Sequence, residues 1–377
     1  MLSKILIAPD SFKGTMSSIE VCDLIEKGIK NIRPDIETVK VPIADGGEGT
    51  VDAFLTAVGG KKVFINAKDP FFRDIKTFYG ILKDNKTAVI EMAAVSGLSL
   101  VGEHMDPLIA STYGTGQLIL DALNRGCKKI IVGIGGSATN DGGIGALAAL
   151  GARFIDTAGY EIPLNGGGLA GLSRIDITKV DKRIKESEIL VACDVSNPLY
   201  GPEGAAYVYA PQKGADEVMV KDLDRNLRHY AAVIKDMFGI NVQEIPGTGA
   251  GGGLGAALAV FAGAVLKSGI NIILDAVCFD ETLQGVDLVI TGEGKIDGQS
   301  LRGKVPLGIA ERTAQYEIPV IAIVGNIGDN IDDIYKKGIS AVFSTMRRPI
   351  PFEIAKDSCR DDLLQTTESI IRFASVL

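Results

Sequence analysis

The chain has 377 residues, of which 46% are hydrophobic and 23% are charged, and its formal net charge is −8. This length predicts a globular protein of about two domains, and the acidic balance argues against nucleic-acid binding, which needs a basic footprint. The five cysteines are scattered without a C-x-x-C pair, which favours a reducing, cytoplasmic location. The N-terminal apolar run is too short for a signal peptide, and no stretch is long enough to span a membrane.

The first 65 residues alternate between strands and helices. A strand is predicted in "KILIAPD" and another in "ETVKVPI", separated by the loop "SFKGTMSS" and an amphipathic helix. Ser17 and Glu20 form a predicted capping box at the start of that helix. The loop "ADGGEGT" follows the second strand and opens a further helix.

The middle of the chain is more mixed. Strands are predicted in "TAVIEMA" and "EILVACDV", and helices in "GTGQLILDALNRG" and over residues 216–238. Between them lies the strand, glycine turn and small-residue helix of "KKIIVGIGGSATNDGGIGALAAL". The stretch "GTGAGGGLGAALAVFAGAVL" is predicted to be a buried helix with a glycine-rich start.

Strand and helix alternation returns at the C-terminal end, with strands in "VDLVI", "IPVIAIVG" and "ISAVFST". Because a parallel sheet needs its crossovers, we expect both chain ends to form one domain. The predicted fold class is therefore α/β, with a Rossmann-like parallel-sheet domain from residues 1–65 plus 285–377. A large mixed α/β domain is inserted at residues 66–284, and the active-site cleft is expected between the two.

Three loops of the first domain carry similar polar residues. Ligands of open parallel sheets bind beyond the carboxyl ends of the strands, where "APDSFKGT", "ADGGEGT" and "TGEGKIDGQSLRGK" are expected. Carboxylates, cations and turn glycines gathered there suit an anionic substrate, Mg²⁺ and phosphate, although each loop alone reads equally well as a solvated turn. The candidate residues are Asp10, Ser11, Lys13, Asp45, Glu48, Glu293, Asp297 and Arg302.

The predicted insertion holds two glycine-rich stretches and an acidic loop. The spacing from Gly133 to Ala138, with Asp156 further on, fits a dinucleotide-binding turn, but a carboxylate inside the turn would repel a pyrophosphate. The run at Gly251 and Gly252 suits either a phosphate cradle or close helix packing. Asp194 follows a strand and precedes a glycine-punctuated loop, which favours a functional carboxylate. The candidate phosphate-binding residues are Gly135, Gly136, Ser137, Thr139, Asn140, Asp141, Gly251 and Gly252.

Taken together, "PDSFKGTMSS", "ADGGEGT", "GIGGSATNDGG", "CDVSNPLYGPEGAAYVYAPQKGA", "GTGAGGGLGAAL" and "TGEGKIDGQS" closely resemble the bacterial glycerate kinase family. The resemblance spans nearly the whole chain in the right order. It implies phosphorylation of D-glycerate with ATP and Mg²⁺, with 2-phosphoglycerate favoured over 3-phosphoglycerate. Apart from the resemblance, we expect a cytoplasmic protein that is a monomer or a homodimer.

On this hypothesis, phosphoryl transfer needs positioning, charge neutralisation and one base. We expect Lys13 to contact the transferring phosphate or the substrate carboxylate, and Asp194 to act as base. Asp45 is expected to bind Mg²⁺ or the substrate hydroxyl, and Arg302 to clamp the substrate carboxylate. Asp10, Ser11 and Glu48 complete the expected substrate site, and Glu293 and Asp297 the metal site. Two alternatives remain: an NAD-dependent 2-hydroxyacid dehydrogenase built around Gly133 to Asp156, and a small-acid binding protein without catalysis.

Overall fold

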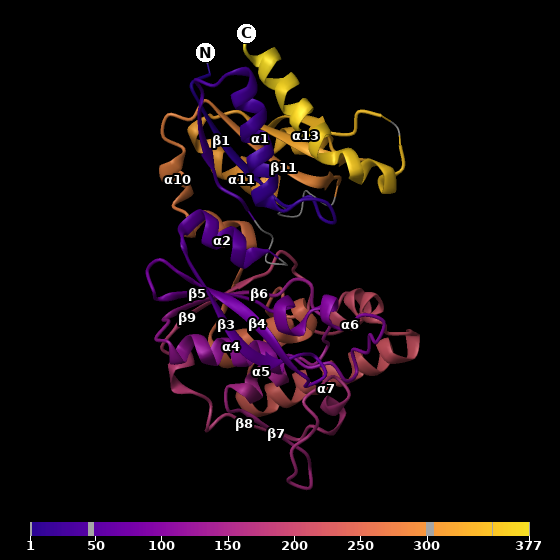
Figure 1. The fold of residues 1–377 in the computed structure, drawn as a ribbon. Helices are drawn as coiled ribbons and strands as arrows, with labels where there is room; N and C mark the ends of the chain where they lie inside the picture. The colour runs from indigo at the N-terminus through magenta and orange to yellow at the C-terminus, as the bar shows by residue number, and fades with distance from the viewer. Residues whose placement is uncertain (1, 44–48, 299–304, 349, 377) are drawn as a thin grey trace. The chain divides into compact units, whose positions relative to one another are not determined.

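The computed structural model describes residues 2–43, 49–298, 305–348 and 350–376. The chain forms two compact units. The first combines residues 1–45, 52–58 and 270–377, and the second combines residues 46–51 and 59–269. Both chain ends therefore belong to the first unit (Figure 1).

The first unit is built on a five-stranded sheet in which all neighbouring strands are parallel. Its strands are β1 (Lys4–Pro9), β2 (Glu37–Lys40), β11 (Leu288–Ile296), β12 (Val320–Ile327) and β13 (Ile339–Ser344). They lie in the order β13-β12-β11-β1-β2, so β1 lies between β2 and β11. This is the flavodoxin-like, doubly wound order, which reverses direction at the pair of β1 and β11. The predicted Rossmann-like parallel sheet is confirmed.

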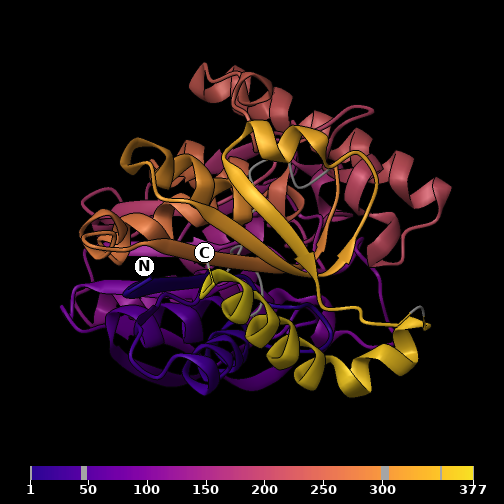
Figure 2. The ribbon, with the colours of Figure 1, turned by 90° about the horizontal axis from the view of Figure 1, so that it is seen from above.

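Helices cover both faces of this sheet, as its buried central strands β1 and β11 require. The helices of the unit are α1 (Ser18–Ile32), α2 (Thr50–Val58), α9 (Gly269–Ala276), α10 (Phe279–Thr282), α11 (Val305–Thr313), α12 (Asp332–Lys336) and α13 (Phe352–Ala374). The side chains of α1 and α13 share one core with Ile5 and Ile7, and α13 runs beside α1 (Figures 1 and 2). Gly28 permits this approach, because a Cβ there would lie 2.9 Å from the Cβ of Thr367. The predicted cap of α1 is also present: Ser17 Oγ accepts a hydrogen bond from the Glu20 amide at 3.2 Å.

The second unit contains a six-stranded sheet in the order β10-β9-β6-β5-β4-β3. Its strands are β3 (Gly60–Lys68), β4 (Asp74–Leu82), β5 (Thr87–Glu91), β6 (Lys129–Gly133), β9 (Glu188–Ala192) and β10 (Val265–Lys267). The four strands β5, β6, β9 and β10 are mutually parallel, whereas β3 and β4 add an antiparallel ribbon at one side. A separate antiparallel pair joins β7 (Arg153–Ile155) to β8 (Arg174–Asp176).

Two hydrophobic cores hold the second unit together. Its helices are α3 (Ala93–Ser96), α4 (Tyr113–Asn124), α5 (Ile144–Ala149), α6 (Ala205–Tyr209), α7 (Glu217–Phe238) and α8 (Leu254–Ala262). The first core packs α4 and α8 against the sheet, and the second packs α7 against β7 and β8. The predicted helix over residues 216–238 begins one residue later, because Asp216 is its N-cap and accepts from the Val218 and Met219 amides. The helix expected to reach Leu266 ends at Ala262, where Gly263 adopts a φ of 66°.

The borders of the two units differ from the predicted domain borders at 65/66 and 284/285. Strand β3 pairs with β4 along its whole length, so residues 60–65 belong to the second unit. Helix α9 belongs with the first unit from Ile270 onwards, and Ile270 lies against Gly308 of α11, where a Cβ would come within 2.7 Å of its side chain. Among the described residues, no helix has the length and apolarity needed to cross a membrane.

Candidate functional site

The point where the strand order of the first sheet reverses carries two carboxylates. Pro9 of β1 pairs with Gly292 of β11, and the next residue on each strand is acidic: Asp10 and Glu293. The Asp10 amide donates to the Gly292 carbonyl at 2.8 Å, which extends the register to these residues. Asp10 is 7% exposed and Glu293 is 5% exposed. Such a reversal at the carboxyl ends of parallel strands is where doubly wound folds bind ligands, so strand register alone brings two candidate residues to the expected position.

The loop after β1 brings Ser11 and Lys13 to the same edge. The Ser11 amide donates to Asp10 Oδ1 at 2.7 Å, and the following turn is closed by hydrogen bonds between Phe12 and Met16, whose side chains are buried. A Cβ on Gly294 of β11 would lie 3.4 Å from the Lys13 amide. The loop therefore packs over β11, with the exposed Lys13 beside the switch point.

The remaining candidates of this unit lie farther along or outside the described residues. Asp297 follows the end of β11, and its Oδ2 is 3.1 Å from Lys295 Nζ. Asp297 is four residues beyond Glu293 along an extended chain, which corresponds to roughly 13 Å. Asp297 therefore lies farther along the strand than the pair of Asp10 and Glu293 at the switch point. The candidates Asp45, Glu48 and Arg302 fall outside the described residues and stay predictions from the sequence.

In the second unit, the carboxyl ends of three parallel strands are in register. Glu91 of β5 pairs with Gly133 of β6, which pairs in turn with Ala192 of β9. Gly135 and Asp194, each two residues further on, therefore lie at the same edge. Glu91 is buried, and its Oε1 accepts a hydrogen bond from the Val51 amide at 2.6 Å. Sequence reasoning missed Glu91, because the last acidic residue of an apolar strand carries no motif.

Asp194 is oriented by a helix. Its Oδ1 accepts a hydrogen bond at 2.9 Å from the amide of Gly269, the first residue of α9. The N-terminal end of a helix favours an anionic side chain, and the hydrogen bond restricts the rotation of the carboxylate. The acidic loop predicted to be functional thus holds its carboxylate in a defined direction.

The β6–α5 loop divides into an accessible part and a buried part. Gly136 is exposed and adopts a φ of 70°, and Gly135 is half-buried. The predicted phosphate-binding residues that follow, Ser137, Thr139, Asn140 and Asp141, are all buried. Of this set, the Gly135–Gly136 turn is therefore the part that a phosphate can reach.

Asp141 is fully buried and bound by its own chain. Its Oδ2 accepts from the amide and the hydroxyl of Thr112, both at 2.8 Å, and its two oxygens also accept from the Gly143 and Gly145 amides at the start of α5. Burial raises the pKa of Asp141, while these hydrogen bonds act in the opposite direction. The carboxylate that the sequence offered as a phosphate-binding candidate is therefore directed towards the amides at the start of α5.

We expect Asp141→Asn to lower the free energy of unfolding by about 2–4 kcal/mol. The amide group that replaces one oxygen cannot accept, so at least one buried N–H or O–H donor loses its partner, at about 1–3 kcal/mol each, and the new NH₂ group is itself a buried donor without an acceptor. Urea unfolding measures the change. Asp176→Asn, at a half-buried aspartate that accepts from Thr178, is the control and should stay within about 0.5 kcal/mol of the parent protein. Equal stabilities for the two variants would contradict this account of Asp141.

Sequence reasoning also missed Lys213. Its Nζ donates to the Thr139 carbonyl at 2.6 Å and to Ser137 Oγ at 3.3 Å, and the residue is only 3% exposed. Burial lowers the pKa of Lys213 to about 7, and the charge of Asp141 acts against that shift. No pattern in "YAPQKGA" indicates a buried lysine, since lysine is ordinarily exposed.

The glycine run before α8 packs against the β6–α5 loop. Gly251, Gly252 and Gly253 have φ values of 62°, 68° and 96°, which favour glycine. A Cβ on Gly252 would lie 2.0 Å from the Thr139 carbonyl oxygen, and the Gly142 amide donates to the Gly252 carbonyl at 3.0 Å. Of the two interpretations open from the sequence, these contacts are those of close packing.

The structure removes the basis of the dinucleotide-binding alternative. A dinucleotide-binding unit needs the strand after its first helix to lie parallel in the same sheet. Strand β7 instead pairs with β8, antiparallel and outside the six-stranded sheet. Asp156, the expected ribose ligand, caps a turn by accepting from the Ala158 and Tyr160 amides at 2.9 Å.

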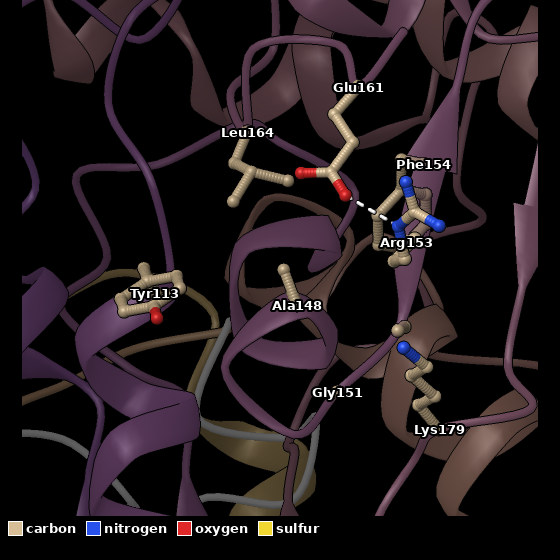
Figure 3. Close-up of a pocket in the computed structure, with 9 residues that line it drawn as sticks. Tyr113, Ala148, Gly151, Arg153, Phe154, Glu161, Leu164 and Lys179 are labelled. Atoms are coloured by element: carbon tan, nitrogen blue, oxygen red, sulfur yellow. Dashed lines mark hydrogen bonds and ion pairs between the residues drawn. The ribbon is translucent and has the colours of Figure 1, made fainter. Parts of the chain in front are cut away.

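A hollow of about 360 Å³ lies beside β7. Figure 3 shows Arg153 and Glu161 at its wall, joined by an ion pair of 2.5 Å, with Lys179 nearby. None of the predicted site residues lines this hollow. It is a surface feature separate from both strand edges described above.

The comparisons with known proteins agree with the fold. The model of the glycerate kinase family matches residues 5–375. The chain is 48% identical to glycerate kinase of Bacillus cereus and 48% identical to glycerate 2-kinase of Escherichia coli, in each case over 97% of both chains. Its structure is similar to the crystal structure of a Salmonella typhimurium protein assigned as glycerate kinase 2, with a TM-score of 0.89 and 44% identity, over 100% of this chain and 99% of that one. The chain therefore belongs to the glycerate kinase family and is a kinase.

Proposed function

We propose that this protein transfers the γ-phosphoryl group of ATP to the 2-hydroxyl of D-glycerate, which yields 2-phosphoglycerate and ADP. The observation that carries the proposal is the pair of buried carboxylates, Asp10 and Glu293, beside the exposed Lys13 at the switch point of the first sheet. An anionic acid and an anionic nucleotide need such a combination of cations and metal-binding oxygens. The name of the E. coli relative, glycerate 2-kinase, supports the choice of the 2-hydroxyl.

In the proposed step, the 2-hydroxyl oxygen of glycerate attacks the γ-phosphorus in line with the leaving group. The new oxygen–phosphorus bond forms as the bond from the γ-phosphorus to the bridging oxygen breaks, and ADP leaves with that electron pair. The hydroxyl proton passes to the carboxylate of Asp194. The hydrogen bond from the Gly269 amide to Asp194 Oδ1 orients this carboxylate, which supports its proposed role as the base.

Charge neutralisation is proposed for Lys13, and phosphate contact for the turn at Gly135 and Gly136. The Lys13 ammonium is proposed to bind the transferring phosphoryl group or the carboxylate of glycerate, with Ser11 donating beside it. Backbone amides of the turn at Gly135 and Gly136, which is accessible and left-handed at Gly136, are proposed to bind phosphate oxygens.

Mg²⁺ is the proposed metal, and Asp10 with Glu293 would hold it. Mg²⁺ in kinases is commonly bound by one or two carboxylates together with the phosphates of the nucleotide, and two buried carboxylates on adjacent strand ends fit that requirement. Across the residues that the structure describes, no group of three or more histidine, cysteine, aspartate or glutamate side chains could hold an ion by itself. Bound there, Mg²⁺ would neutralise phosphate charge.

The test of the function is ADP formation from ATP, measured with D-glycerate as the acceptor. D-lactate keeps the 2-hydroxyl but lacks the 3-hydroxyl, and 3-hydroxypropionate keeps only the terminal hydroxyl. We expect D-glycerate to stimulate ADP formation strongly, with D-lactate a weak acceptor and 3-hydroxypropionate inactive. Absence of D-glycerate-dependent ADP formation would exclude the proposal and leave binding without catalysis as the alternative.

A further inference from the structure

We propose that Lys213 is a positioning residue that fixes the β6–α5 loop so that its Gly135–Gly136 turn can receive the phosphates of ATP. This inference rests on the proposed function, because it assigns the turn to ATP. Lys213 itself touches neither substrate, since it lies behind the turn among buried groups.

The contacts of Lys213 are made to the segment just after the turn. Its Nζ donates to the Thr139 carbonyl at 2.6 Å and to Ser137 Oγ at 3.3 Å. Ser137 Oγ also accepts from the Thr139 amide at 3.1 Å, which closes a bend from Ser137 to Thr139. Lys213 Nζ therefore contacts both ends of this bend. Behind that bend, the Thr139 carbonyl is pressed against Gly252, where a Cβ would lie 2.0 Å away. The segment is therefore held from two sides, and the turn that precedes it is also held at Gly136, whose carbonyl accepts from the Leu98 amide at 2.9 Å.

Stability does not explain why a lysine occupies this position. An ammonium group sealed from water costs several kcal/mol of solvation, and apolar replacement of buried charges is often neutral or stabilising. Burial lowers the pKa of Lys213 to about 7, which is a sign of the same cost. A methionine of similar length would fill the same space without this solvation cost. We therefore infer that the lysine serves to hold the geometry of the turn.

The position also matters for electrostatics. Asp141, on the same loop, is fully buried and its negative charge opposes anion binding. Asn140 Oδ1 is also buried and has no hydrogen-bond partner among the described residues. Lys213 Nζ contacts this loop from within, and in its protonated form its charge offsets that of Asp141.

The experiment compares the parent protein with Lys213→Met and Lys213→Gln. We expect Lys213→Met to raise KM for ATP about tenfold or more, since small displacements of positioning groups carry large kinetic costs, and to change KM for D-glycerate less than about twofold. Lys213→Gln keeps a donor and should fall between. Lys179→Met, at an exposed lysine of the same unit (Figure 3), is the matched control and should leave both KM values unchanged.

The outcomes are separable. An unchanged KM for ATP in Lys213→Met overturns the proposal, as does failure of both Lys213 variants to fold, because the role would then be structural. A parent protein without D-glycerate-dependent ADP formation contradicts the proposed function instead. In that case calorimetric titration with ATP still decides the role of Lys213: equal affinity of the parent and Lys213→Met for ATP refutes it, and at least about tenfold weaker binding supports it.

Discussion

Asp194→Asn should lower kcat for D-glycerate phosphorylation by ~10²–10⁴-fold, the usual contribution of a general base. In the parent protein, Asp194 Oδ1 accepts a hydrogen bond from the Gly269 amide at 2.9 Å. The side-chain oxygen of asparagine can accept the same hydrogen bond. The anchoring of the side chain at the start of α9 is therefore preserved while its capacity to take a proton is lost. Steady-state kinetics at saturating ATP and D-glycerate measure the change, and circular dichroism checks the fold.

The matched control for Asp194 is Asp156→Asn. Asp156 also accepts from backbone amides, those of Ala158 and Tyr160, but it lies beside β7, outside the six-stranded sheet. It should keep kcat within about twofold, as surface changes away from a site normally do. If Asp194→Asn retained full turnover, Asp194 would not be the base, and a wholly inactive Asp156→Asn would reopen the role of the segment from Lys128 to Asp156.

Lys13→Ala should lower kcat/KM for D-glycerate by ~100-fold, the scale of losing one charge-stabilising contact in a transition state. The variant should fold normally, because the turn that carries Lys13 is closed by backbone hydrogen bonds between Phe12 and Met16. Kinetics at several D-glycerate concentrations separate the two expected roles. A loss confined to KM indicates contact with the glycerate carboxylate, and a loss in kcat indicates contact with the transferring phosphoryl group.

Lys27→Ala provides the comparison, since Lys27 is an exposed lysine on α1 of the same unit. Its kinetics should match those of the parent protein. A folded Lys13→Ala variant with the kinetics of Lys27→Ala would remove Lys13 from the mechanism.

The first sheet was largely predictable from the sequence, because its strands are short apolar runs and its connections carry recognisable caps such as Ser17. Register then followed from parallel pairing, which sets Asp10 beside Glu293. The antiparallel ribbon of β3 and β4 was not predicted, since exposed strands at the side of a sheet have weak hydrophobic alternation: β3 is mostly exposed or half-buried. Because β3 belongs to this ribbon, the first border between the units lies before the predicted position at 65/66.

The errors and omissions in the second unit have a common physical cause, which is that local sequence does not reveal tertiary partners. The residues from Gly133 to Asp156 fit a dinucleotide-binding spacing, yet only the pairing of β7 with β8 decides against it. Lys213 and Glu91 were missed because both are charged residues that a sequence reader places at the surface. Their burial depends on residues far away in the chain, Thr139 and Val51.

The central claim is that this member of the glycerate kinase family phosphorylates the 2-hydroxyl of D-glycerate. Its most direct test is to incubate the protein with D-glycerate, ATP and Mg²⁺, remove the protein, and add enolase without a phosphoglycerate mutase. Enolase dehydrates 2-phosphoglycerate to phosphoenolpyruvate and does not act on 3-phosphoglycerate. We predict that phosphoenolpyruvate appears at once without a mutase, and that its amount rises in proportion to the ADP formed. ADP formation with phosphoenolpyruvate only after a mutase is added would contradict the 2-hydroxyl assignment, and no D-glycerate-dependent ADP at all would contradict the function.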